Sequence, residues 1–175
     1  MLRTFRARPP LPVRRVGDGP ILLVVENADT FDSLRRRLTA SPTAVGHVAW
    51  GAGAAFEASV LGIGELDGVH DVAYFGDLDA DGLRIPASAA ATAAIEGLPA
   101  IRPARGLYRL LFEHGITQPG QAPLPEPRAA ELAAWLDVHA AAAARRLLES
   151  AVRIPQESVN AALLAHAVET WSADL

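Results

Sequence analysis

An apolar run that ends in three alternating aspartates constrains the fold of this chain most strongly. Val72 to Phe75 is a β-prone run, and the segment from Gly76 to Gly82 follows it with aspartates at positions 77, 79 and 81. The run predicts a buried strand, and the segment rich in glycine and aspartate predicts the turn that leaves it. Because alternate residues of an extended chain share a face, Asp77 and Asp79 should point the same way, while Leu78 turns back toward the core.

Carboxylates held this close repel each other, so their negative charge must be compensated. A hard divalent cation usually provides the compensating charge, because Mg²⁺ binds one or two carboxylates together with water and phosphate oxygens. The segment therefore predicts a site for Mg²⁺ or Mn²⁺, with Asp77, Asp79 and Asp81 as candidate ligands. A polar turn without a ligand is the alternative.

Strand and helix patterns alternate around this segment. The aliphatic run Ile21 to Val25 predicts a strand buried on both faces, and Asp29 or Thr30 is the expected N-cap of the helix that follows. Further strands are expected over residues 44–50, 72–75 and 100–103, and helices over 31–38, 54–61, 83–97, 107–114, 128–150 and 156–171. This alternation predicts an α/β fold with a mainly parallel, Rossmann-like four-stranded sheet of order 2-1-3-4, flanked by helices and followed by C-terminal helices.

Glu26 follows the first of these strands, and the aspartates follow the third. In a sheet of this order the two strands are neighbours, and ligands bind at the carboxyl ends of such strands. We therefore expect Glu26 to share one crevice with Asp77, Asp79 and Asp81, and such a concentration of charge calls for a metal. Later in the chain, Gln156 and Glu157 either border this crevice or cap the last helix.

These residues resemble the motifs of the Toprim domain, which is found in topoisomerases, bacterial primases and several nucleases. The resemblance rests on Glu26-Asn27 after the first strand and on the Gly-Asp-x-Asp-x-x-Gly turn of residues 76–82. Further matches are Thr30-Phe31, Tyr74-Phe75, Ile85 and Pro155-Gln156-Glu157. With them, residues 21 to 171 are most similar to the C-terminal domain of JetD, the nuclease subunit of the Wadjet anti-plasmid system, which is related to the Toprim domain of the topoisomerase VI A subunit.

The resemblance implies metal-dependent cleavage of DNA phosphodiester bonds. Glu26 would be the catalytic residue and a metal ligand, Asp77 and Asp79 would hold Mg²⁺, and Asp81 exceeds the two aspartates of the family pattern. Supporting positions would be Asn27, Gly76, Gly82, Gln156 and Glu157. The implied partners are DNA and either a second copy of the chain or a larger complex with condensin-like subunits. The winged-helix domains that precede Toprim in these families are absent from this sequence, so we do not expect strand passage.

The expected chemistry agrees with this resemblance. A metal neutralises charge on a phosphate and lowers the pKa of a bound water, and a nearby glutamate can then take or return a proton. Two alternatives stay open: a Toprim domain that binds DNA or assembles without catalysis, and an Asp-x-Asp phosphohydrolase with Asp77 as nucleophile. The phosphatase pattern expects Thr or Val at position 81 and a lysine later in the chain. This sequence has Asp81 at that position and contains no lysine. An EF-hand loop is disfavoured because Ser88 stands where the bidentate glutamate belongs.

Composition limits the other possibilities. The chain has a net charge of −4 and no cysteine, which argues against a strongly basic nucleic-acid surface and excludes thiolate chemistry. Residues 1–20 form a basic, proline-rich arm, and residues 21–175 form the Toprim-like domain with its C-terminal helices. Outside the arm, arginines cluster at positions 35–37. No run is long enough to span a membrane, no signal peptide follows the start, and we expect a cytoplasmic protein.

Overall fold

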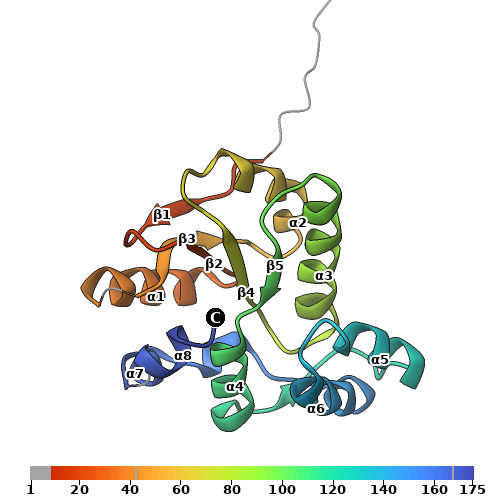
Figure 1. The fold of residues 1–175 in the computed structure, drawn as a ribbon. Helices are drawn as coiled ribbons and strands as arrows, with labels where there is room; N and C mark the ends of the chain where they lie inside the picture. Colours follow the sequence, from red (N-terminus) through yellow and green to blue (C-terminus); the bar gives the residue numbers. More distant parts are fainter. Residues whose placement is uncertain (1–8, 42, 167) are drawn as a thin grey trace, which may run out of the picture.

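A mainly parallel sheet forms the centre of the molecule (Figure 1). The computed structural model describes residues 9–41, 43–166 and 168–175. Within this part, five strands pair in the order β1-β3-β2-β4-β5. The strands are β1 (Val13–Arg15), β2 (Ile21–Val25), β3 (Val45–Trp50), β4 (Asp71–Phe75) and β5 (Ile101–Pro103). β1 runs antiparallel to β3, and the other pairs are parallel.

Helices cover both faces of this sheet, with α1 and α3 on opposite sides in Figure 1. The helices are α1 (Ala28–Ala40), α2 (Ala55–Ser59), η1 (Val60–Glu65), α3 (Ala80–Ile95), α4 (Arg105–His114), α5 (Glu126–Ala133), α6 (Val138–Glu149), η2 (Gln156–Ser158), α7 (Ala161–His166) and α8 (Val168–Ser172). Two short strands, β6 (Gln118–Pro119) and β7 (Val152–Arg153), pair with each other outside the main sheet. Their pairing brings the segment after α6 back toward the loop before α5.

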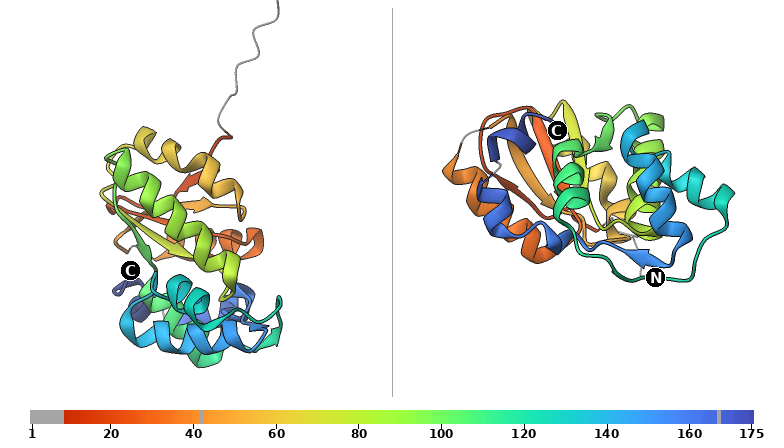
Figure 2. Two further views of the ribbon diagram at one scale, coloured as in Figure 1. Left: turned by 90° about the vertical axis from the view of Figure 1, so that its right-hand side faces the viewer. Right: turned by 90° about the horizontal axis from the view of Figure 1, so that it is seen from below.

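Alternate residues of β2 enter two separate hydrophobic cores, as the unbroken apolar run requires. Leu23 and Val25 pack with α1, α4 and the C-terminal helices, whereas Leu22 and Val24 pack with α2, η1 and α3. The expectation of a strand buried on both faces is therefore confirmed. Figures 1 and 2 show α5 and α6 at one end of the sheet, the end toward which the arrow of β5 points. The C-terminal half of the chain thus gathers near the carboxyl ends of the parallel strands.

The expected four strands are joined by a fifth, β1, from the part of the chain that we assigned to the arm. Val13 lies opposite Ala49, and the backbone N–H of Trp50 donates to the carbonyl oxygen of Pro12 over 2.9 Å. Prolines exclude a helix here, but an edge strand needs ladder hydrogen bonds on one side only. Residues 1–8 of the proposed arm lie outside the described residues.

Two expected long helices are each divided. The helix expected over residues 128–150 is interrupted between α5 and α6, where the carboxylate of Asp137 accepts hydrogen bonds from the N–H groups of His139 and Ala140 and so caps a new helix. The helix expected over residues 156–171 is divided into η2, α7 and α8, and Asn160 accepts from the N–H groups at positions 162 and 163. Side-chain caps of this kind satisfy the first N–H groups of a new helix, so each marks the point where a new helix begins.

The first helix begins earlier than expected, because its N-cap is Asn27 and not Asp29 or Thr30. The side-chain oxygen of Asn27 accepts from the N–H groups of both those residues. In the described part of the chain, no helix is both long enough and apolar enough to cross a membrane.

Candidate functional site

Glu26 and Asp77 meet at the carboxyl ends of two adjacent parallel strands. β2 and β4 pair with Val25 opposite Phe75, so the residues that follow the two strands lie side by side. The Glu26 Oε2 atom accepts a hydrogen bond of 3.3 Å from the backbone N–H of Asp77. Gly76 permits this approach, because a Cβ atom there would lie 2.6 Å from Glu26 Oε2. The structure thus brings together two residues that are far apart in the sequence.

Burial and neighbouring charge make Glu26 an unusual carboxyl group. Its removal from solvent, together with the negative charge of Asp77, raises the pKa of Glu26 from 4.5 to about 7. The charges of Asp79 and Asp81 act in the same direction, while the N–H of Asp77 opposes part of the rise. Glu26 therefore exchanges its proton near neutral pH, as a general acid or base must.

The Asp77 carboxylate is held on both oxygens by the C-terminal segment. Its Oδ1 atom accepts from the backbone N–H of Gln156 over 2.8 Å, and its Oδ2 atom accepts from Arg153 Nη1 over 2.9 Å. The Asp77 side chain is 17% exposed. Burial raises the pKa of Asp77 as well, and the Gln156 N–H opposes part of this rise.

Asp79 and Asp81 are engaged elsewhere. Asp79 is the N-cap of α3 and accepts from the N–H of Gly82 over 2.8 Å. Asp81 is exposed and pairs with Arg84 Nε at 3.0 Å. Leu78, between the aspartates, is buried as expected. The carboxylates of this turn therefore do not all point into one site.

The turn depends on Gly82, because a Cβ atom there would lie 2.2 Å from the carbonyl oxygen of Asp77. Gly82 is thus a close-packing position in the first turn of α3.

Gln156 joins the two strand ends. Its side chain is fully buried, with Nε2 donating to the carbonyl oxygen of Phe75 over 2.8 Å and Oε1 accepting from the backbone N–H of Asn27 over 2.8 Å. The next residue, Glu157, accepts a hydrogen bond from Asn27 Nδ2. Gln156 and Glu157 thus border the Glu26–Asp77 site, and neither side chain caps a helix.

Three contacts at this site were not anticipated. Arg153 pairs with Asp77, the Tyr108 hydroxyl accepts from the N–H of Gly76 over 3.1 Å, and Trp50 Nε1 donates to the Glu26 carbonyl oxygen over 2.9 Å. Trp50 is 36% exposed beside the site. Arg153 and Tyr108 lie in sequence contexts that carry no local signal of function, so only the tertiary structure identifies them.

The donor set determines which metal site is possible. Within residues 9–41, 43–166 and 168–175, no three acidic, histidine or cysteine side chains lie close enough together to hold a metal ion. Glu26 and Asp77, however, present two desolvated carboxylates at the carboxyl ends of the adjacent central strands β2 and β4. This pair is compatible with Mg²⁺, which needs only one or two protein carboxylates when water and phosphate oxygens complete its shell.

The mainly parallel sheet, the helices on both of its faces and the acidic residues at the ends of two adjacent strands define an α/β protein with acidic groups at the carboxyl ends of its central strands. The sequence model of the family described as "Wadjet protein JetD, C-terminal" matches residues 12–168. The chain therefore belongs to the family of JetD C-terminal domains, and the match includes β1. No curated protein and no solved structure has significant similarity to the chain.

Proposed function

We propose that this chain is a metal-dependent nuclease domain that hydrolyses DNA phosphodiester bonds within a JetD-like plasmid-defence system. The observation that carries the proposal is the contact between Glu26 and Asp77, which places two desolvated carboxylates at the carboxyl edge of the sheet. Membership of the JetD C-terminal family supports the defence role. The Toprim resemblance supports the choice of a phosphodiester as substrate.

Glu26 is the proposed proton carrier. The pKa of about 7 holds for the metal-free chain, and a bound cation would lower it. The Glu26 oxygen that does not contact the ion would take a proton from an attacking water and return it to the leaving oxygen. Glu26 and Asp77 would hold Mg²⁺ or Mn²⁺, with Asp79 reaching the same edge after a change of rotamer. The bound ion would supply charge neutralisation and a more acidic water. Gln156 would keep the strand ends at a fixed separation, through its bonds to Phe75 and Asn27.

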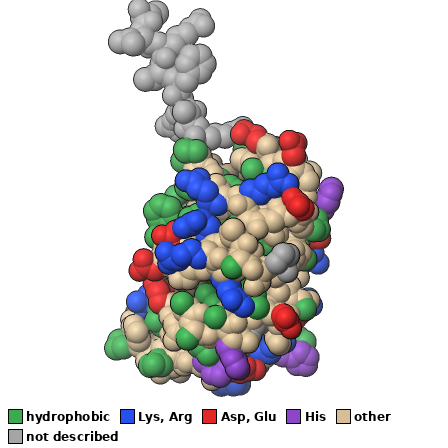
Figure 3. All heavy atoms as spheres, turned by 90° about the vertical axis from the view of Figure 1, so that its left-hand side faces the viewer, with side chains coloured by type: hydrophobic (Ala, Val, Ile, Leu, Met, Phe, Trp, Pro, Cys, Tyr) green, Lys and Arg blue, Asp and Glu red, His purple; other side chains and the backbone are tan. Residues whose placement is uncertain are grey.

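DNA and a protein partner complete the proposal. The chain carries a net charge of −4, whereas duplex binding depends on neutralising phosphates with basic groups. Figure 3 shows the face that carries β1 and α1, where arginine side chains gather over the upper part with acidic side chains among them. Arg14, Arg15 and Arg36 are exposed in these two elements. A second copy of the chain, or a larger complex with condensin-like subunits, would supply further basic contacts.

Metal binding and plasmid cleavage test the proposal. Mn²⁺ should raise the melting temperature of the chain by mass action, and Asp77→Asn should remove most of this increase. Asp174→Asn is the matched control, because Asp174 also pairs with an arginine. In the presence of Mn²⁺, the chain with its partners should nick supercoiled plasmid, and Glu26→Gln should abolish nicking while Glu96→Gln, on the exposed end of α3, should not. Loss of the metal effect in Asp174→Asn, or full cleavage by Glu26→Gln, would contradict the proposal.

A Toprim module without catalysis is the second candidate. It is favoured by the engagement of Asp79 as an N-cap and of Asp81 in an ion pair, which leaves fewer free ligands. This candidate predicts DNA binding that neither Mn²⁺ nor Asp77→Asn changes. An Asp-x-Asp phosphohydrolase is disfavoured because the sequence contains no lysine and has Asp81 where that pattern has Thr or Val. Such an enzyme would hydrolyse p-nitrophenyl phosphate, and we expect no such activity.

A further inference from the structure

We propose that Arg153 is a built-in counter-cation of the site. Its guanidinium holds the Asp77 carboxylate in the metal-free protein, releases that carboxylate to a divalent metal, and then contacts a phosphate oxygen of the substrate. This inference rests on the proposed function. It adds to that function a residue, Arg153, that pairs either with the Asp77 carboxylate or with a phosphate of the substrate.

The ion pair between Arg153 and Asp77 occupies the ligand that the metal needs. Arg153 Nη1 lies 2.9 Å from Asp77 Oδ2. Among the ion pairs of the described residues, this is the one that involves Asp77. Asp81, in contrast, forms an ion pair with Arg84, which also pairs with Glu57. A cation bound at Asp77 must therefore displace this guanidinium or share the carboxylate with it. The pair thus couples metal binding to the position of Arg153.

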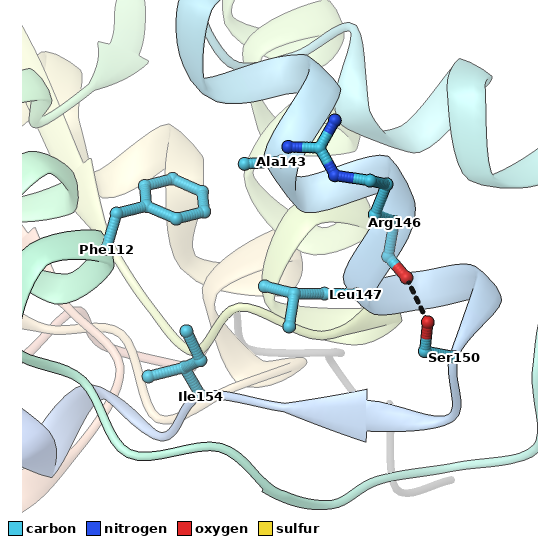
Figure 4. A pocket seen from close by; sticks show the side chains of 6 residues that line it. All are labelled: Phe112, Ala143, Arg146, Leu147, Ser150 and Ile154. Carbon is cyan, nitrogen blue, oxygen red and sulfur yellow. Dashed lines mark hydrogen bonds between the residues drawn. The ribbon is translucent and has the colours of Figure 1, made fainter.

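The backbone around Arg153 is firmly anchored. The next residue, Ile154, pairs with Leu78 through backbone hydrogen bonds of 2.9 and 3.3 Å. Ile154 lines a hollow of about 300 Å³. Figure 4 shows its side chain beside those of Phe112 of α4 and Leu147 of α6. Two residues further on, Gln156 is fully buried. The strand ends and the helices therefore hold the segment that follows Arg153, and the pairing of β7 with β6 holds the backbone at Val152 and Arg153.

The Arg153 side chain, in contrast, can move. It is 37% exposed, whereas its partner Asp77 is 17% exposed. The guanidinium can therefore leave Asp77 by side-chain rotation, with no change in the anchored backbone. A guanidinium released at this edge is suited to a phosphate, because its planar donors match the geometry of phosphate oxygens. The single ion pair thus provides both a stable metal-free state and a substrate contact.

The hollow beside Ile154 is not an alternative site for this chemistry. It is lined by Phe112, Ala143, Arg146, Leu147, Ser150 and Ile154, without any of the acidic residues of the proposed site. Phe112 and Leu147, which line it, pack against the hydrophobic core that contains Ile154 and so help to anchor the segment that carries Arg153.

The test measures two affinities that must change in opposite directions. We compare Arg153→Met, Arg153→Lys, Arg109→Met and the unaltered chain, where Arg109→Met removes a comparable ion pair with Asp174. Because partly exposed ion pairs are weak, the Mn²⁺ dissociation constant of Arg153→Met, measured by calorimetry, should fall about threefold to fivefold. The affinity of the same variant for labelled duplex in the presence of Mn²⁺ should decrease. Arg153→Lys keeps the positive charge but lacks the planar donors, so its Mn²⁺ affinity should lie close to that of the unaltered chain and its duplex affinity should lie between those of Arg153→Met and the unaltered chain. Arg109→Met should leave both affinities unchanged.

The outcomes separate this inference from the proposed function. A structural role alone would weaken both affinities in Arg153→Met, and that result would overturn the inference. Equal Mn²⁺ binding by Arg153→Met and the unaltered chain, still lost in Asp77→Asn, would overturn the inference and leave the proposed function intact. If neither Arg153→Met nor the unaltered chain binds Mn²⁺, both the inference and the proposed function are overturned. Thermal melting of each variant establishes that it is folded.

Discussion

The side-chain amide of Gln156 donates a hydrogen bond of 2.8 Å to the carbonyl oxygen of Phe75, the last residue of β4. The same side chain accepts from the N–H of Asn27, just beyond the end of β2. A fully buried glutamine thus joins the two strand ends that carry Glu26 and Asp77. Its hydrogen bonds replace those that the strand ends would otherwise make to water.

Removing the Gln156 side chain should destabilise the whole domain. Gln156→Ala leaves the Asn27 N–H without its partner and leaves the Phe75 carbonyl oxygen with the Glu26 N–H as its remaining donor, which should lower the free energy of unfolding by about 1–3 kcal/mol. Urea denaturation monitored by circular dichroism measures this change. Gln121→Ala, at an exposed loop position, is the control and should lie within about 0.5 kcal/mol of the unaltered chain. Equal stability of the two variants would contradict the bridging role.

The raised pKa of Glu26 predicts a pH-dependent cost to stability. The unfolded chain loses the Glu26 proton near pH 4.5, whereas the folded chain retains it up to about pH 7. The cost of ionising Glu26 is therefore absent at low pH, grows as the pH rises between these values, and is complete above them. Glu26→Gln should remove this cost.

In the absence of metal, Glu26→Gln should thus raise the free energy of unfolding by about 2–3 kcal/mol at about pH 8 and by almost nothing at about pH 4. Urea titrations of both proteins with a chelator present check this expectation. Glu96→Gln, on the surface, should show no such pH dependence. A constant difference between Glu26→Gln and the unaltered chain at both pH values would show that Glu26 ionises normally.

Two buried tyrosines should respond differently to loss of the hydroxyl. Tyr108→Phe removes the acceptor of the Gly76 N–H and should cost about 1–2 kcal/mol, the usual penalty for a buried group left unpaired. The Tyr74 hydroxyl has no hydrogen-bond partner among the described residues, so Tyr74→Phe should be neutral or stabilising. Thermal or urea unfolding of Tyr108→Phe and Tyr74→Phe measures the two changes in the free energy of unfolding. Equal changes in the two variants would contradict the hydrogen bond assigned to Tyr108.

Gly82 should not tolerate a side chain. An added Cβ atom would lie 2.2 Å from the carbonyl oxygen of Asp77, so Gly82→Ala must shift the turn that carries the aspartates. We expect a loss of at least about 2 kcal/mol, typical of a severe steric conflict. The control is Gly62→Ala, where the nearest atom, Leu11 Cβ, lies at an ordinary contact distance of 3.7 Å. Comparable melting temperatures for the two variants would refute the steric argument.

The chain alone should bind duplex DNA weakly. Its net charge is −4, and the proposed site is itself acidic, so few phosphates can be neutralised without a partner. Titration of labelled duplex should show weak binding at physiological salt and tighter binding as the salt concentration falls. Cleavage by the lone chain should be slow. Tight binding with rapid multiple turnover by the isolated chain would show that no partner is required.

Local patterns in the sequence were sufficient for the central strands. The run Ile21 to Val25 is apolar throughout, so it can only be stable when both of its faces are covered, and it is β2 in the structure. The positions of Glu26 and Asp77, each just beyond an apolar run, follow from the same pattern. Burial of Leu78 follows from the alternation of side chains along an extended chain. These features depend on neighbouring residues alone.

Only the tertiary structure decided which groups meet the acidic residues. The contacts of Asp77 with Arg153 and of Gln156 with Asn27 join residues separated by 76 and 129 positions. Periodicity reports which face of an element is buried, but it carries no information on which distant element covers that face. The breaks before α6 and α7, where Asp137 and Asn160 act as caps, have the same origin. There, packing of α6 against α5 and of α7 against α1 decides where a helix must turn, and local helix propensity does not.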